Sequence, residues 1–473
     1  MSTTVFPTAP ELVAFVQAED PHAQHHLALL RQAEDWVRDA GRRGTLEACR
    51  LAARLERWRY QHLRERQGRW DSRDWQLADR LDELARQLAG RQPLPPRWTY
   101  QALASAQFDP AALNEALAAL NPCTPLEKIC QQARQITEAN FSVDISKPGL
   151  VTGISAGEAG GLTGQGQLGA KQLRKRRMFM YAPLYLSSFC VNYCAYCGFR
   201  FPEPIERRHL TRGEARQEAE ALRQLGFRHI LLVTGDYPQL VSPHYLAEIA
   251  SDLCQLGIHP GVEIAPLDTD GYETLVRAGV RSITLYQETY DLGRYEKYHP
   301  RGPKSSFLWR LEGLDRAAEA GMRRLGLGIL LGLGEPQTEL VQLMRHGVYL
   351  ERRFPGRRIA FSLPRIHEAP SDFAIPHPVD DETFIRLYCA LRIAFPRAEL
   401  VLSTRERPEL RDYLARVCIT QMSAGSSTAP GGYTSPAEVT GLGKQFPVHD
   451  SRPAPEVFRS LEEAGFHLVW QID

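Results

Sequence analysis

The sequence predicts an α/β protein in which a helical extension precedes a (β/α)8 barrel. Two observations predict the barrel. From Met178 onward, short apolar runs alternate with amphipathic helical segments, and there are eight such runs, as many as a closed barrel requires. Polar residues follow several of these runs, and the C-terminal ends of barrel strands are where functional groups collect.

Residues 1–95 are predicted to form the extension, whose role the sequence leaves open. Apolar residues recur three and four positions apart, and several segments end near glycine, which is typical of amphipathic helices. The expected helices are residues 10–17, 25–41, 45–66 and 74–90. A proline-rich linker follows at residues 93–96. We expect the extension either to pack on the barrel or on a second subunit, or to dock a partner protein.

Residues 96–145 are expected to form two or three helices that pack on the barrel, and residues 146–177 a glycine-rich and basic insertion. Eight glycines fall between Gly149 and Gly169, and they are followed by Lys171, Arg174, Lys175, Arg176 and Arg177. The stretch contains no GK[ST] sequence, so it is not a phosphate-binding loop of that type. A surface loop is the simplest interpretation. The alternatives are a mobile flap over the site and a basic contact for an acidic electron donor.

Residues 178–473 contain the predicted barrel and a C-terminal cap. The eight expected strands are residues 179–187, 229–234, 261–266, 282–287, 324–333, 358–363, 398–404 and 417–423. Polar positions at or just beyond the ends of these strands should meet on one rim of the barrel. These positions are Cys190, Gly235-Asp236, Gln287-Glu288, Thr404-Arg405 and Ser423. Their agreement on one predicted face supports the barrel and locates the expected site.

Composition narrows the class of protein. The chain has 473 residues, of which 43% are apolar and 24% charged, and its formal net charge is +1. This charge gives no reason to expect a nucleic-acid or membrane partner, and no apolar stretch approaches the ~18 residues of a membrane span. The N-terminus lacks the features of a secretory signal. Nine cysteines, mostly scattered, suit a reducing compartment, so we expect a cytoplasmic protein.

Three cysteines carry the strongest chemical signal. Cys190, Cys194 and Cys197 form a C-x3-C-x2-C pattern, and the next cysteine is Cys254. Three thiolates this close can hold three corners of an iron–sulfur cube and leave one iron open for chemistry, whereas a closed site needs a fourth ligand. A structural zinc knuckle or a chance cluster is the alternative. The other six cysteines are expected to be small buried hydrophobic residues.

The cysteine pattern, with Tyr196 before its last member, resembles the signature of radical S-adenosylmethionine (SAM) enzymes. Six blocks resemble, in order and spacing, the tyrosine-lyase group of that superfamily: residues 181–200, 230–239, 285–299, 302–333, 402–412 and 419–433. This group includes the 2-iminoacetate synthase of thiamine thiazole biosynthesis and the tyrosine lyase of iron-only hydrogenase maturation, and tryptophan-cleaving relatives share part of the pattern. The resemblance runs from about Trp98 to Asp473.

The resemblance implies a [4Fe-4S] cluster, held by the three cysteines, and SAM as the cofactors. Tyr196 and Phe199 would shield the cluster and contact adenine. The Thr234-Gly235-Asp236 turn would receive the SAM amino group, although most of the family has glutamate at the position of Asp236. The remaining implied SAM contacts are Glu288, Arg310, Gly328 and Ile329. Asp236 could instead be an ordinary turn residue, and Arg310 could form a salt bridge on its helix surface.

The resemblance also implies substrate contacts. Arg405 would bind the substrate carboxylate, because a charge that closes an apolar strand needs a partner, and Ser423 could donate to the same group. Pairing of Arg405 with Glu406 or Glu409 at the barrel rim is the alternative. Two further residues resemble family positions near SAM or substrate, namely His299 and Lys304.

The activity implied by the resemblance is cleavage of the Cα–Cβ bond of L-tyrosine to 2-iminoacetate (dehydroglycine) and p-cresol, for thiamine thiazole biosynthesis. The implied partners are a flavodoxin- or ferredoxin-type electron donor and a thiazole synthase. No cysteine follows Cys418, unlike in the hydrogenase-maturation relative, whose C-terminal cysteines hold a second cluster. A paralogous lyase that acts on tryptophan or feeds another pathway is one alternative, and a non-catalytic scaffold that carries the cluster is another.

Overall fold

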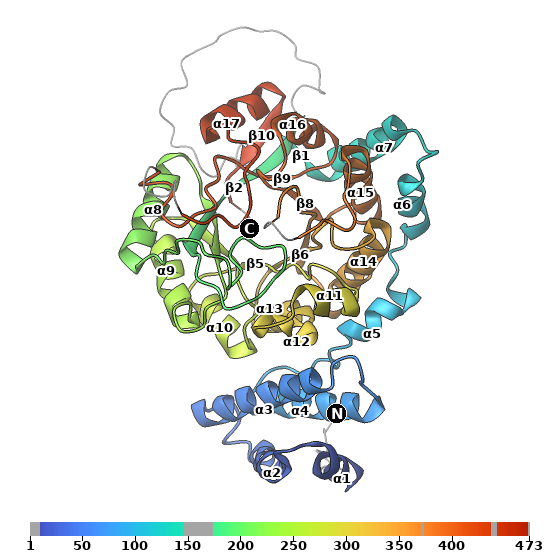
Figure 1. Cartoon of the computed structure of the whole chain (residues 1–473), viewed down its shortest axis with the longest axis vertical. Coiled ribbons are helices and arrows are strands. Elements are labelled where there is room, and N and C mark those ends of the chain that lie inside the picture. Colours follow the sequence, from blue (N-terminus) through green and yellow to red (C-terminus); the bar gives the residue numbers. More distant parts are fainter. Residues whose placement is uncertain (1–9, 146–173, 370–372, 437–441, 472–473) are drawn as a thin grey trace.

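A computed structural model describes residues 10–145, 174–369, 373–436 and 442–471. Within these ranges, eight parallel strands close into a barrel, because β2 pairs with both β3 and β9 (Figure 1). The strands are β2 (Arg174–Ser187), β3 (His229–Thr234), β4 (His259–Glu263), β5 (Ser282–Thr284), β6 (Arg324–Gly328), β7 (Arg358–Ser362), β8 (Glu399–Leu402) and β9 (Gln421–Ser423). The expected fold class is therefore confirmed, and each expected strand overlaps one of these eight.

Helices cover the outside of the barrel. They are α8 (Arg212–Gln224), α9 (Pro243–Gln255), α10 (Thr269–Arg277), α11 (Leu292–Tyr298), α12 (Phe307–Leu311), α13 (Gly313–Glu319), α14 (Pro336–Arg353), α15 (Asp381–Ala394) and α16 (Pro408–Val417). Local sequence explains several of their starts. Thr211 and Glu214 form a capping box at α8, and Ser242 caps α9 with Pro243 in its first turn. No helix of the described ranges is long and apolar enough to cross a membrane.

The first barrel strand begins earlier than the sequence predicts. Arg174–Arg177, expected in the insertion, belong to β2, where β1 (Ser142–Asp144) and β10 (Phe466–Val469) flank them; α17 (Ala454–Glu463) precedes β10. The 14 residues of β2 span roughly 40 Å at about 3.3 Å per residue. These basic residues therefore lie at the end of β2 remote from the cysteines. The glycine-rich residues 146–173 lie outside the described residues.

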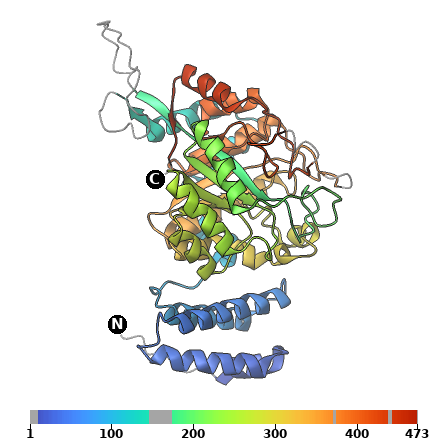
Figure 2. The ribbon, with the colours of Figure 1, turned by 90° about the vertical axis from the view of Figure 1, so that its left-hand side faces the viewer.

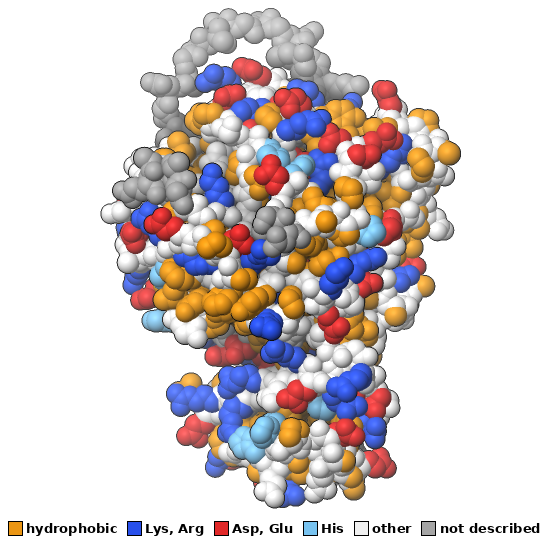
Figure 3. Space-filling view, in the orientation of Figure 1, with side chains coloured by type: hydrophobic (Ala, Val, Ile, Leu, Met, Phe, Trp, Pro, Cys, Tyr) orange, Lys and Arg blue, Asp and Glu red, His pale blue; other side chains and the backbone are white. Residues whose placement is uncertain are grey.

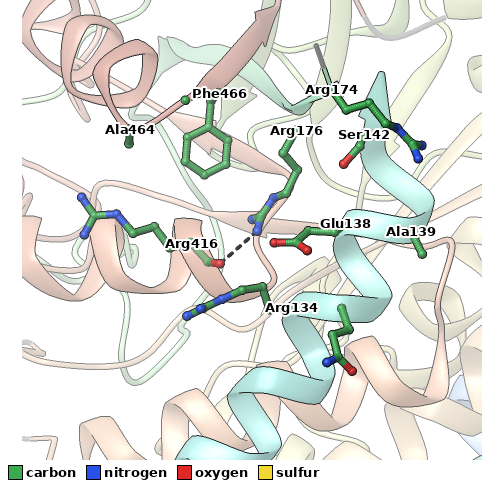
Figure 4. Close-up of a pocket in the computed structure, with 11 residues that line it drawn as sticks. Arg134, Glu138, Ala139, Ser142, Arg174, Arg176, Arg416, Ala464 and Phe466 are labelled. Atoms are coloured by element: carbon green, nitrogen blue, oxygen red, sulfur yellow. Dashed lines mark hydrogen bonds between the residues drawn. The ribbon is translucent and has the colours of Figure 1, made fainter. Parts of the chain in front are cut away.

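Several arginines line a cavity of about 680 Å³ at the N-terminal end of β2 (Figure 4). Arg134 comes from α7, Arg174 and Arg176 from β2, and Arg416 from α16. Arg176 is buried and donates to the carbonyl oxygen of Arg416 at 3.0 Å. It also donates to the carbonyl oxygen of Ile419. These bonds tie the start of β2 to the loop between α16 and β9, so this arginine helps close the barrel.

Four helices of the extension form a bundle of their own beside the barrel (Figures 1 and 2). They are α1 (Pro10–Glu19), α2 (Ala23–Arg38), α3 (Leu46–Glu65) and α4 (Ser72–Leu88), and a separate apolar core holds them together. Helices α3 and α4 lie next to the barrel, and α1 and α2 lie beyond them (Figures 1 and 2). Helix α3 contacts α10 and α12 of the barrel. Arg59 of α3 donates to Glu312 at 2.6 Å, and both side chains are fully buried. The extension thus packs on the barrel through a buried, charged interface.

Residues 96–145 run along the barrel surface. They form α5 (Thr99–Ala104), a short 3-10 helix η1 (Ala106–Phe108), α6 (Leu113–Leu120) and α7 (Leu126–Phe141), which pack on α14, α15 and α16. Positive and negative side chains are intermixed over the face in Figure 3, in line with the near-zero net charge.

The expectation that the six remaining cysteines are buried is wrong in part. Cys130, Cys389 and Cys418 are buried, but Cys123 and Cys254 are exposed and Cys49 is half-buried.

Candidate active site

The three cysteines lie in a loop that follows β2 and is held by backbone hydrogen bonds from three directions. The N–H of Val191 donates to the carbonyl oxygen of Asp236, after β3, at 2.9 Å. The N–H of Ala195 donates to the carbonyl oxygen of Tyr298, at the end of α11, at 3.0 Å. The N–H of Gly198 donates to the carbonyl oxygen of Gln445 at 3.2 Å. Distant parts of the chain therefore fix the positions of the cysteines.

Glycine is required at one point beneath this loop. A Cβ atom at Gly235 would lie 2.2 Å from the carbonyl oxygen of Phe189 and 3.2 Å from the Cβ atom of Cys190. The N–H of Gly235 donates to the carbonyl oxygen of Ser187 at 2.8 Å. Only a residue without a side chain allows the turn after β3 to approach the cysteine loop this closely.

The three cysteines face one cavity of about 100 Å³ at the C-terminal ends of the strands. All three cysteines and Phe199 line it, together with residues from the ends of β3, β4 and β5 and from α12. These further residues include Thr234, Gly235, Asp236, Glu263, Tyr286, Glu288, Lys304, Arg310 and Gln445. Among the predicted SAM and cluster residues, Tyr196, His299, Gly328 and Ile329 do not line this cavity.

Cys194 is buried, and Cys190 and Cys197 are half-buried. Burial raises the pKa of Cys194 to about 12 and that of Cys197 to about 11. A bound metal offsets this effect, because its positive charge stabilises the thiolate. A single zinc ion would need thiolates about 2.3 Å from one common point. No group of three or more His, Cys, Asp or Glu in the described ranges is arranged to hold one metal ion.

Glu288 is the centre of the charged groups in the cavity. Its carboxylate accepts a hydrogen bond from Lys304 Nζ at 2.6 Å and from Arg310 Nη2 at 3.2 Å. Burial would raise the pKa of Glu288, but the two cations hold it below its usual value. Arg310 therefore pairs across the cavity, not along its own helix. Glu288 also has a φ of 75°, the only positive φ of a non-glycine residue in the described ranges, and such strain is concentrated at functional sites.

A chain of hydrogen bonds leads from Glu288 to a buried histidine. Lys304 Nζ donates to the hydroxyl of Tyr196 at 3.1 Å, and that hydroxyl lies 2.8 Å from His299 Nε2. His299 Nδ1 lies 2.8 Å from the carbonyl oxygen of Tyr295. Burial holds the pKa of His299 well below its usual value, so the imidazole is neutral. Tyr196 thus points its hydroxyl at His299, and the ring lies beside the cavity.

The predicted turn after β3 behaves as part of the cysteine loop. Asp236 Oδ2 accepts a hydrogen bond from Asn192 Nδ2 at 2.8 Å, and burial raises the pKa of this carboxyl. Asp236 is therefore more than an ordinary turn residue. The hydroxyl of Thr234 is buried and has no hydrogen-bond partner in the described residues, although Thr234 lines the cavity. A buried polar atom without a partner marks a place where a ligand can bind.

Gly328 and Ile329 do not line the cavity but contact residues that do. A Cβ atom at Gly328 would lie 2.3 Å from the ring of Tyr286, so the glycine makes room for this tyrosine. Ile329 pairs with Glu288 in an isolated bridge, which helps hold the strained backbone of Glu288. Their contact with adenine stays a prediction.

Two charges near the cavity lack an ionic partner. Arg405 stacks on Phe446, with 3.6 Å between its guanidinium carbon and the ring centre, and no carboxylate of the described residues lies within ion-pair distance. Glu406 pairs with Arg365 and His367, and Glu409 lies near Arg407. The predicted rim pairing of Arg405 is therefore absent from the described structure.

Glu263, at the end of β4, is the second of these charges, and the sequence analysis missed it. It lines the cavity, and its carboxyl has no hydrogen bond or ion pair among the described residues. Burial raises the pKa of Glu263 to about 7; the nearby Glu288 adds to this rise and Arg405 opposes it. One charge inside the apolar run 261–266 was the available signal.

Ser423 is buried at the end of β9, and its hydroxyl accepts a hydrogen bond from the N–H of Thr404 at 3.1 Å. It does not line the cavity. Ser423 is thus placed to fix the backbone that carries Arg405, and its direct contact with a substrate stays a prediction.

Comparison with known proteins agrees with this geometry. Residues 184–347 match the model of the Radical SAM superfamily, and residues 362–467 match that of the Biotin and Thiamin Synthesis associated domain. Over 343 residues the chain is 32% identical to 2-iminoacetate synthase of Salmonella typhimurium, covering 72% of this chain and 90% of that protein. The same values hold for 2-iminoacetate synthase of Escherichia coli.

The chain belongs to the radical SAM family that contains 2-iminoacetate synthase.

Solved structures support this placement. HydG, a maturase of the [FeFe]-hydrogenase, superposes with a TM-score of 0.65 at 30% identity, covering 79% of this chain and 76% of HydG. HydG from Carboxydothermus hydrogenoformans gives a TM-score of 0.64 at 29% identity, covering 90% of this chain and 85% of that chain. Methylornithine synthase (PylB), with a TM-score of 0.55 at 19% identity, shares the fold.

As a member of this family, the protein is a radical SAM lyase that uses a [4Fe-4S] cluster and SAM. The residues present fit both groups. Cys190, Cys194 and Cys197 would each bind one iron and leave the fourth open. The hydroxyl of Thr234, which lacks a partner, and the carboxylates of Asp236 and Glu288 face the same cavity and can accept from hydroxyl or amino groups of SAM.

Proposed function

We propose that the enzyme cleaves the Cα–Cβ bond of an aromatic amino acid, with L-tyrosine as the favoured substrate, to give 2-iminoacetate and p-cresol. Similarity to 2-iminoacetate synthases and the match to the Biotin and Thiamin Synthesis associated domain support a role in thiamine thiazole biosynthesis. A flavodoxin- or ferredoxin-type protein would supply the electrons, and a thiazole synthase would take the 2-iminoacetate. Such a transfer suits a product whose imine hydrolyses in water.

The unpaired charges Glu263 and Arg405 carry the proposal. Each shifts the pKa of the other, yet the two side chains form no ion pair. These half-buried groups of opposite charge have no ionic partner among the described residues, and they match the two charges of a zwitterionic amino acid. Arg405 would hold the α-carboxylate in a bidentate, charge-assisted pair, and Glu263 would accept from the α-amino group.

Binding in this way determines which bond reacts. When bound, the cluster and SAM together supply a carbon-centred radical that removes a hydrogen atom. Two protein contacts on the amino-acid end would hold the amino N–H bonds, not the weaker C–H bonds of the side chain, toward that radical. Scission of the Cα–Cβ bond would then leave a benzylic radical, which takes up one electron and one proton to become p-cresol. Each turnover therefore consumes two electrons and one proton.

The test is product analysis of the reconstituted enzyme. The protein would be loaded with iron and sulfide under anaerobic conditions, reduced with dithionite, and given SAM with tyrosine or tryptophan in separate reactions. We expect p-cresol and glyoxylate, the hydrolysis product of 2-iminoacetate, from tyrosine by mass spectrometry. Cys194→Ala serves as the control that loses the cluster and all SAM cleavage. Formation of 5′-deoxyadenosine without p-cresol would overturn tyrosine as the substrate and leave the radical chemistry in place.

A further inference from the structure

The extension meets the barrel at two places of different character. The middle of α3 forms buried ion pairs, such as Arg59 with Glu312. The C-terminal end of α3 and the turn after it instead contact residues 302–307, which run from Gly302 to the start of α12. This second contact is made by Arg64 and Gln67, which are exposed and half-buried respectively. It therefore contributes little apolar burial to the packing of the extension.

Gln67 bonds to two residues of this contact segment and to Glu296 of α11. Its amide nitrogen donates to the carbonyl oxygen of Ser305 at 3.3 Å and to Glu296 Oε1 at 3.1 Å. Its amide oxygen accepts from the N–H of Phe307 at 3.0 Å. Phe307 is the first residue of α12, and Ser306 before it makes no side-chain cap. Gln67 thus satisfies a free N–H at the start of α12 from another part of the chain.

The opposite side of the same segment touches the cysteine loop. The N–H of Lys304 donates to Asn192 Oδ1 at 2.9 Å, and Asn192 in turn donates to Asp236. Gly302 has a φ of 93°, and a Cβ atom there would lie 2.9 Å from the Cα atom of Asn192. Residues 302–307 are therefore held between the extension on one side and the loop of the three cysteines on the other.

Two charged residues of the cavity depend on this segment. Lys304 lies within it and bonds to Glu288 and to the hydroxyl of Tyr196. Arg310 lies one turn into α12 and bonds to Glu288 and to the carbonyl oxygen of Tyr286 at 2.6 Å. A shift of the segment by a few tenths of an ångström would move both cations relative to Glu288, and positioning errors of this kind lower the efficiency of an active site.

We propose that Gln67 of the N-terminal extension is a positioning residue of the SAM site, which fixes residues 302–307 so that Lys304 and Arg310 hold Glu288 in place. The extension then contributes to the geometry of the active site. The inference rests on the SAM chemistry of the family and not on tyrosine as the substrate. A failure of the tyrosine assignment would leave it untouched.

The experiment compares Gln67→Ala with Gln61→Ala in the full-length protein. Gln61 lies on α3 and is exposed, and its amide donates to Glu65 of the same helix, so it controls for a change in the extension alone. Because the three hydrogen bonds of Gln67 are lost, we expect a rise of about tenfold in the KM for SAM in 5′-deoxyadenosine formation for Gln67→Ala, with kcat changed less. Gln61→Ala should match the parent protein.

Two further readouts separate positioning from mere stability. In the cluster-free protein, hydrogen–deuterium exchange of the Phe307 amide should become faster in Gln67→Ala, while exchange within α3 stays unchanged. In the reduced holoenzyme, the change that SAM induces in the electron paramagnetic resonance spectrum of the cluster should weaken. The double variant Gln67→Glu/Glu296→Gln restores an acceptor for Phe307 and a donor at position 296, and should recover part of the KM.

Either of two results would overturn the proposal. One is a KM, an exchange rate and a spectrum for Gln67→Ala that equal those of Gln61→Ala. The other is a large fall in melting temperature with faster exchange throughout the extension, which would show that Gln67 only stabilises the packing.

Discussion

Two regions of the molecule bury charged side chains, and they differ in how the charges are satisfied. At the interface between the extension and the barrel, the carboxylate of Glu312 accepts from Arg59 and from the hydroxyl of Tyr60, and Arg86 donates to Glu319. At the C-terminal ends of the strands, Glu263, which lines the cavity, and Arg405 have no ionic partner among the described residues.

The pKa values of the two carboxyls Glu312 and Glu263 are shifted in opposite directions. Burial would raise the pKa of Glu312, but Arg59 more than offsets it, and the pKa lies below its usual value. Burial raises the pKa of Glu263 to about 7, and Arg405 only partly opposes this. Burial also lowers the pKa of Arg405. Paired charges serve the fold, whereas half-buried charges without an ionic partner destabilise the free protein, and a ligand that pairs with them would offset this cost.

Breaking a satisfied pair should have the largest effect on stability. Arg59→Ala would leave Glu312 buried without its cation, and we expect a loss of about 3–5 kcal/mol in the free energy of unfolding. Unfolding in guanidinium chloride measures it. Arg57→Ala is the matched control, since this side chain lies on the same helix with 62% exposure, and should change stability by less than about 0.5 kcal/mol. A loss below about 1 kcal/mol for Arg59→Ala would contradict the view that the paired charges at this interface stabilise the fold.

Removal of the unpaired cation should instead affect catalysis. For Arg405→Ala we expect at least about a 100-fold fall in kcat/KM for lyase turnover, since a buried charge–charge contact to substrate is lost. Cluster loading and 5′-deoxyadenosine formation should remain, and the free energy of unfolding should not fall. Arg407→Ala, two positions along with its side chain 58% exposed, is the control. Full lyase activity in Arg405→Ala would remove this residue from the substrate site.

The carboxyl of Glu263 should make the free energy of unfolding depend on pH. Because burial raises the pKa of Glu263 from 4.5 to about 7, the folded state binds the proton more tightly than the unfolded state. Its contribution to stability is full below pH 4.5 and is lost as the pH rises to about 7. Glu263→Gln has no such loss, so its stability relative to the parent should increase over this range, by up to about 3 kcal/mol.

Chemical unfolding of the cluster-free parent and variant at pH 5.5 and pH 8 measures this difference. A difference that stays the same at both pH values would show that Glu263 is ionised with a partner. In the holoenzyme, the same substitution should raise the KM for the amino acid, because one of its two charge contacts is removed.

The smallest effect is expected at Ser423. Its hydroxyl accepts from the N–H of Thr404 and lies away from the cavity, so Ser423→Ala should cost about 1 kcal/mol of stability. We expect lyase turnover to change by no more than about threefold, as measured by p-cresol release. A fall as large as that of Arg405→Ala would instead mean that Ser423 contacts the substrate directly.

The parts of this structure that could be predicted from sequence are those with a local signal. The alternation of apolar runs and helical segments identifies the barrel, and the spacing of Cys190, Cys194 and Cys197 identifies the cluster loop. The start of β2 was misplaced, because its basic residues read as a loop until β1 and β10 are seen to pair with them.

Contacts between distant residues left no such signal. Gln67 and Phe307 are 240 positions apart, and nothing in either stretch indicates the pairing. The roles of His299 and Lys304 could be named only through the resemblance, since their link through Tyr196 depends on the folded loop. Glu263 was missed because one carboxylate in an apolar strand is equally consistent with a buried ion pair until its surroundings are known.

The way in which β2 is paired has a consequence for the biogenesis of the enzyme. This strand begins the barrel, yet its neighbours include β9 and β10, which come far later in the chain. The cysteine loop that follows β2 also needs Gln445, whose carbonyl oxygen accepts a hydrogen bond from the N–H of Gly198. On the ribosome the three cysteines emerge long before these residues. The loop can therefore reach its enclosed form only after Gln445 has been synthesised, which makes this part of the barrel late to form.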